Sequence, residues 1–91
     1  MFEKSLPIGS VVLLKGADKR LMITGYLKKL AGDDAKVYDY CGVPFPQGYV
    51  DAEAVAVFDH AQIEHIYALG FQNEIQFIFR EKLEKLIAER G

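Results

Sequence analysis

The spacing of apolar residues changes near the end of the chain, and this change limits the possible folds. From Asn73 onward, apolar residues recur at steps of three and four, which places them on one stripe of a helix. Asn73 is a favourable N-cap, and Glu74 lies in the first turn, where the helix dipole favours acidic residues. The pattern predicts a helix to about Arg90, anchored on the rest of the fold by Phe79 and Leu83. The predicted inward-facing stripe comprises Ile75, Ile78, Phe79, Leu83, Leu86 and Ile87.

Upstream of this helix, short apolar runs alternate with glycine and proline, which is typical of strands and turns. The run Val11–Leu14 and the segment Arg20–Tyr26 predict an antiparallel hairpin. A polar loop is expected over residues 28–34. The alternating segment Lys36–Val43 predicts a third strand. Two prolines in the segment that follows, Pro44–Gly48, are expected to end it.

The next segment is less regular. Residues 51–58 fit either a helix or a strand, and both interpretations stay open. Asp59–Gln62 has the form of a capping box and predicts one helical turn, followed by a strand over Ile63–Gly70. The fold class expected is α+β: a strongly bent antiparallel sheet of four or five strands, open or barrel-like, packed against a C-terminal α-helix. Ninety-one residues suit a single domain, 1–91.

Charge and composition exclude several classes of protein. Half the residues (51%) are apolar, which excludes intrinsic disorder. The net charge of −2 argues against a dedicated nucleic-acid binder, although six basic residues lie between Lys15 and Lys36. No apolar run approaches the roughly 20 residues that a membrane span needs. With a single cysteine and no secretory signal pattern at the start, the expected location is the cytoplasm.

The sequence contains no recognisable catalytic, cofactor or metal motif. His60 and His65 are too few, with Cys41, to complete a zinc site, and a separation of five positions does not place both histidines on one helical face. The glycines match no phosphate-binding loop. Carboxylates are frequent between Val37 and Phe79, but no spacing specifies an acid–base pair. We therefore expect no enzyme activity, no cofactor and no metal.

Aromatic residues are the candidate contacts for a partner. Four of them surround the proline-rich bend, where they could form core, stack on bases or grip a peptide. A fifth, Phe77, lies off the main stripe of the predicted helix and is expected to be exposed. The residues predicted to bind a protein partner are Tyr38, Tyr40, Phe45, Tyr49 and Phe77.

Four segments in the same order resemble domain-of-unknown-function family 4176. Leu6–Gly16 and Lys19–Tyr26 are similar to its opening hairpin, and Tyr38–Tyr49 to its central tyrosine-aspartate-tyrosine and proline-x-glycine segment. Phe58-Asp59-His60-x-x-Ile63 resembles its turn motif. The resemblance extends over about residues 5–85; Gln47 departs from it, where an acidic residue is more usual.

The resemblance implies a role in toxin handling. Proteins of this family are typically encoded beside LXG-type toxins and other components of the type VIIb secretion system. It therefore implies a non-enzymatic accessory protein, chaperone-like or targeting, that binds such a toxin, and it assigns no catalytic residues. Two alternatives stay open: an immunity-type protein that blocks a toxin, and a small-barrel nucleic-acid or regulatory module.

Overall fold

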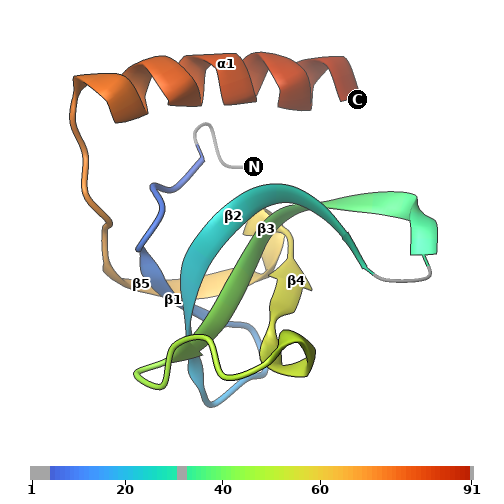
Figure 1. Cartoon of the computed structure of the whole chain (residues 1–91), viewed down its shortest axis with the longest axis vertical. Helices are drawn as coiled ribbons and strands as arrows, with labels where there is room; N and C mark the ends of the chain where they lie inside the picture. Colours follow the sequence, from blue (N-terminus) through green and yellow to red (C-terminus); the bar gives the residue numbers. More distant parts are fainter. Residues whose placement is uncertain (1–4, 31–32, 91) are drawn as a thin grey trace.

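The computed structural model describes residues 5–30 and 33–90, which form five strands, two 3₁₀ turns and one helix (Figure 1). In chain order the elements are β1 (Val11–Leu14), β2 (Arg20–Leu30), β3 (Asp33–Phe45), η1 (Ala52–Ala54), β4 (Ala56–Phe58), η2 (His60–Gln62), β5 (Ile63–Ala68) and α1 (Glu74–Arg90). The sequence-based fold class, α+β with a bent antiparallel sheet, is confirmed.

All neighbouring strands are antiparallel, in the order β4-β3-β2-β1-β5. The first four strands form a meander, and β5 returns to pair with β1. The two edge strands, β4 and β5, therefore follow each other in the chain and are joined only through Asp59 and η2. This short connection draws the two edges together and bends the sheet strongly, although within the described residues no strand pairing closes it into a barrel.

Residues 28–34 were expected to be a loop, and this expectation is wrong for most of the segment. β2 continues through Leu30 and β3 begins at Asp33, so the two strands extend together as a hairpin arm (Figure 1). Lys28 lies opposite Tyr38, and Lys29 lies opposite Val37. A two-stranded arm away from the core does not need alternating apolar residues, so its sequence lacks the usual strand pattern.

β3 also continues past the position where proline was expected to end it. Pro44 lies opposite Leu21 and Phe45 opposite Arg20. β4 pairs with β3 only along the short stretch Tyr40–Gly42, so Pro44 lies where β3 has one neighbouring strand among the described residues. Proline is tolerated at such edge positions because it interrupts fewer ladder hydrogen bonds.

The ambiguous segment 51–58 contains both kinds of structure. Asp51 accepts a hydrogen bond from the Ala54 N–H (3.0 Å) and caps η1, after which the chain extends into β4. The capping box before β5 is confirmed, since the Asp59 N–H donates to Oε1 of Gln62 (2.8 Å). Beyond β5, a Cβ on Gly70 would lie 1.9 Å from the backbone oxygen of Ile8, so the backbones approach as only glycine allows.

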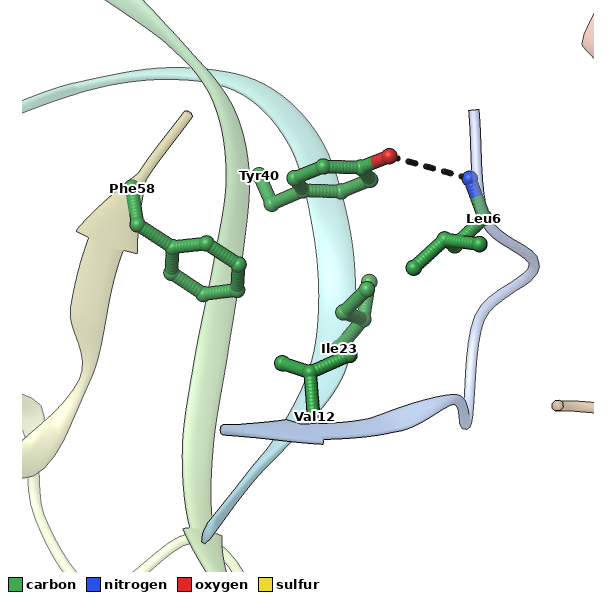
Figure 2. Packing of buried hydrophobic residues seen from close by; sticks show 5 residues of the cluster. All are labelled: Leu6, Val12, Ile23, Tyr40 and Phe58. Carbon is green, nitrogen blue, oxygen red and sulfur yellow. Dashed lines mark hydrogen bonds between the residues drawn. The ribbon is translucent and has the colours of Figure 1, made fainter. Parts of the chain in front are cut away.

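The core lies between the bent strands and the segment before β1. Tyr40 and Phe58 are stacked with ring centroids 5.5 Å apart (Figure 2). Tyr40, one of the residues predicted to bind a partner, has no exposed surface in this structure and belongs to the core. The five residues of the core cluster are Leu6, Val12, Ile23, Tyr40 and Phe58.

The N-terminal segment 5–10 lies between α1 and the strands (Figure 1). The Ser5 N–H donates to a carboxylate oxygen of Glu84, and Leu83 is buried with 3% of its surface exposed. The predicted cap is confirmed, since the Gln76 N–H donates to Oδ1 of Asn73 (3.0 Å). In the described part of the chain, no helix is long and apolar enough to cross a membrane.

The predicted apolar stripe of the helix is mostly exposed, which corrects the expectation that it faces inward. Leu83 is buried and Ile87 is partly buried, but Phe79, expected as an anchor, is 50% exposed. The N-terminal segment lies directly beneath α1 and β2 reaches the helix with the Tyr26 ring, so only part of the helix surface is covered (Figure 1). The exposed members, called here the helix stripe, are Ile75, Ile78, Phe79 and Leu86.

Candidate partner-binding site

An apolar groove of about 450 Å³ lies beside the start of α1. One wall comes from Phe71, in the segment between β5 and α1, and from two members of the helix stripe, Ile75 and Phe79. The other wall comes from Ile8 of the N-terminal segment and Tyr26 of β2. Asn73 and Gln76 complete the lining with their side-chain amides.

The apolar side chains of this groove are unusually exposed. Phe71 and Ile75 expose 78% and 75% of their surface, and Ile8 is also exposed. Burying one such side chain completely contributes about 1.5–3 kcal/mol. Small soluble domains rarely leave neighbouring large apolar residues in water unless they serve in binding. The remaining members of the helix stripe continue this surface along α1.

Gln76, in the lining of the groove, carries an unsatisfied hydrogen-bond acceptor. Its Oε1 atom is buried, and within the described residues no hydrogen bond reaches it. An unsatisfied buried acceptor costs about 1–3 kcal/mol.

Leu6 connects the groove residue Tyr26 to the core through two hydrogen bonds. The Tyr26 hydroxyl donates to the Leu6 carbonyl, and the Leu6 N–H donates to the Tyr40 hydroxyl (3.0 Å; Figure 2). Burial raises the pKa of Tyr26 and of Tyr40, so both hydroxyls stay protonated. The ring of Tyr26 lies 5.8 Å from that of Phe79, centroid to centroid, and thereby links the sheet to the exposed stripe.

A second network holds η2 against β3. The Asp39 N–H donates to Oδ1 of Asp59 (3.1 Å), and the His60 N–H donates to Oδ2 of Asp39 (2.9 Å). Lys36 forms an ion pair with Asp59 (2.8 Å). Burial lowers the pKa of His60, whose Nδ1 lies 2.7 Å from the Tyr40 hydroxyl. These carboxylates and this histidine therefore hold the backbone in place.

The aromatic residues predicted from the sequence do not come together as one site. Tyr38 is partly buried on the hairpin arm, with the Lys36 ammonium 4.9 Å from its ring centroid. Phe45, at the end of β3, and Tyr49, in the loop that follows, are both exposed, Tyr49 by 67%. Phe77 is exposed on α1, with the Arg80 guanidinium 5.3 Å from its ring centroid. For these four, a role in partner binding stays a prediction.

Sequence reasoning missed the groove because its members come from separate parts of the chain. Ile8 and Phe71 lie outside regular elements, and no periodic pattern includes them. Helical periodicity includes Ile75 and Phe79 but predicts that both face the core. A large aromatic residue directly after Gly70 was the one local signal of an exposed apolar position.

The described residues contain no group of three or more His, Cys, Asp or Glu side chains placed to hold a metal ion. Cys41 is buried on β3, with its sulfur 3.6 Å from the hydroxyl of Thr24. His65 packs edge-on against Tyr67, with centroids 4.5 Å apart. None of these residues lines the apolar groove beside α1. The exposed apolar walls of that groove are suited to burying an apolar segment of another molecule.

Comparison with known families identifies one match. The family model described as "Domain of unknown function (DUF4176)" matches residues 5–79. The match includes Ile8, Tyr26, Phe71, Ile75 and Phe79, and therefore spans the apolar lining of the groove. No curated protein and no solved structure matches the chain.

Proposed function

The chain belongs to the DUF4176 family, and we propose that it is a non-enzymatic cytoplasmic protein that binds an LXG-type toxin before type VII secretion. The toxin is suggested by the genes that typically accompany such proteins. The exposed apolar groove is the observation that carries a binding role. A protein segment buried there would remove Phe71 and Ile75 from water.

The chemistry of the groove favours a protein over a nucleic acid. Its walls are apolar, and its polar members are the neutral amides of Asn73 and Gln76. Nucleic-acid binding draws much of its affinity from Lys and Arg contacts to phosphate, and the lining of this groove contains neither. A partner helix that presents apolar side chains at steps of three and four would fit along the helix stripe.

The test is co-purification with the toxin encoded beside the gene. Ile75→Asp should abolish capture, because it places a charge in the groove. It should also leave folding intact, since Ile75 is exposed and lies in the first turn, where Asp is favourable. Tyr49→Asp is the comparison variant, since Tyr49 is also exposed (67%) but lies outside the groove. A site in the groove should leave its capture unchanged, whereas the sequence-based prediction that Tyr49 contacts the partner expects a loss.

Three results would change the proposal. Failure to capture the toxin would remove the proposed partner. Equal capture by wild type and Ile75→Asp, with loss in Tyr49→Asp, would move the site to the proline-rich bend. Protection of cells from the toxin by this protein alone would favour the immunity-type role.

A further inference from the structure

A second groove, of about 380 Å³, lies at the end of the sheet away from α1. It is bounded by the turn between β1 and β2 and by the loop after β3, both at the bottom of Figure 1. Asp18 and Lys19 come from that turn, and Gln47 from that loop. It shares no lining residue with the apolar groove.

The strands hold the central side chains of this groove in one row. Arg20 of β2 lies opposite Phe45 of β3 on one side and Leu13 of β1 on the other. Leu13 in turn lies opposite His65 of β5. Directly opposed residues project from the same face of a sheet, so Phe45 and Arg20 share a face supported by four strands.

Tyr67 of β5 fixes the orientation of Arg20. The guanidinium carbon lies 4.2 Å from the Tyr67 ring centroid, and the same ring packs edge-on against His65. Stacking on a ring occupies one flat face of a guanidinium and leaves its N–H edges available. Those edges match the two oxygens of a carboxylate in a bidentate pair.

The charges of the groove fit one anionic group. Lys19 and Arg20 supply two positive charges and Asp18 one negative charge, so the lining carries one net positive charge on a protein of net charge −2. A nucleic-acid strand would need more cations along its phosphates. Phe45 and Tyr67 are both exposed and provide apolar surface on either side of the cation.

We propose that this groove binds a peptide carboxylate that neighbours an apolar side chain. Arg20 pairs with the carboxylate, Lys19 adds attraction, and the rings of Phe45 and Tyr67 cover the apolar side chain. The carboxylate belongs either to a peptide C-terminus or to an Asp or Glu side chain. This site is separate from the proposed toxin-binding groove, and its test does not depend on the toxin.

The test uses three short peptides with the full chain, followed by NMR amide shifts and calorimetry. Acetyl-Ala-Ala-Phe with a free C-terminus carries a terminal carboxylate, and its amidated form carries none. Acetyl-Phe-Glu-Ala amide carries only a side-chain carboxylate. Binding by the first peptide alone identifies a C-terminal ligand, whereas binding by the first and third identifies any carboxylate beside an aromatic residue.

Variants assign the binding to Arg20. Arg20→Gln should weaken binding at least tenfold, and Arg20→Lys should weaken it less, because the charge stays while the stacked fork is lost. Lys28→Gln, which removes an exposed cation of β2 outside the groove, should have no effect. Urea unfolding of each variant separates lost binding from lost structure.

Four outcomes would overturn the proposal: no binding of either carboxylate peptide, equal binding of the amidated control, unchanged affinity in Arg20→Gln, or shifts that avoid Arg20 and Tyr67. Stronger competition by an oligonucleotide or by inorganic phosphate than by the peptides would assign the groove to phosphate instead. Capture of the toxin by Arg20→Gln at wild-type level would leave both proposals standing as independent sites.

Discussion

The hydroxyl of Tyr40 lies 2.7 Å from Nδ1 of His60, and the same hydroxyl accepts a hydrogen bond from the Leu6 N–H at 3.0 Å. One buried ring on β3 thereby connects η2 to the N-terminal segment. With the Leu6 N–H donating to the hydroxyl oxygen, the hydroxyl proton is left to donate to Nδ1 of a neutral His60.

Removing this hydroxyl should destabilise the fold. Tyr40→Phe keeps the ring in the core but leaves the Leu6 N–H and His60 Nδ1 without that partner, so we expect a loss of about 1–3 kcal/mol in the free energy of unfolding. Tyr38→Phe, on the partly buried arm, should change it by less than about 0.5 kcal/mol. Urea melts measure both, and equal values for the two variants would contradict this role of Tyr40.

Stability should depend on pH through His60. Burial lowers the pKa of His60 below its ordinary value of 6.5, so the unfolded chain binds the proton more readily than the folded chain. Neutral His60 therefore contributes fully to the free energy of unfolding above pH 6.5. This contribution is lost as the pH falls from 6.5 through the lower pKa of the folded state. His60→Asn retains an acceptor for Tyr40 and should flatten this dependence.

The control for the pH experiment is His65→Asn, which removes the other histidine. Its unfolding free energy should keep the wild-type slope between about pH 7 and pH 5.5, a range chosen to lie above the titration of ordinary carboxylates. A slope that disappears in His65→Asn and persists in His60→Asn would refute the assignment.

The helix should be anchored by Leu83 and hardly at all by Leu86. Leu83 is the buried apolar residue of α1, with 3% of its surface exposed, so Leu83→Ala should cost about 2–5 kcal/mol. Leu86 is 54% exposed, and Leu86→Ala should cost less than about 1 kcal/mol. Both changes remove the same atoms from the same helix, so urea melts compare burial alone. The reverse order would mean that the helix stripe faces inward in solution.

Binding of the proposed protein partner should depend little on salt. Burial of apolar side chains is not screened, so the affinity should survive a change from about 50 to about 500 mM salt, whereas phosphate contacts would weaken by orders of magnitude. Calorimetry with the purified toxin measures this directly. A steep loss of affinity with salt would show that charged contacts dominate the complex.

Local signals predicted the local structure well. The Asn73 cap and the capping box of Asp59 and Gln62 are confirmed because each depends on residues three positions apart. The pairing of β1 with β2 and the α+β class are confirmed because alternation and turn residues mark them. The polar arm formed by β2 and β3 has no such pattern, and its sequence therefore predicts a loop where the structure has strands.

The candidate site could not be predicted in the same way, because it is formed by contacts between residues far apart in the sequence. Tyr38 and Tyr40 are the same residue type at alternate positions of one strand, so the sequence does not distinguish them. In the fold, Phe58 and Leu6 enclose only Tyr40. The buried side of α1 depends on the width of what lies beneath it. Because that neighbour covers only part of the helix surface, Phe79 and Ile75 lie in a groove, whereas helical periodicity alone places them in the core.

The hydrogen bond between Ser5 and Glu84 joins residues 79 positions apart, with the segment that begins at Ser5 lying beneath the last helix. Because a chain is synthesised from its N-terminal side, this segment and the five strands are made before the helix that lies over them. Until α1 has been made and has docked, the segment lacks this cover and stays open to chaperones or to a partner, although the strands can already pair.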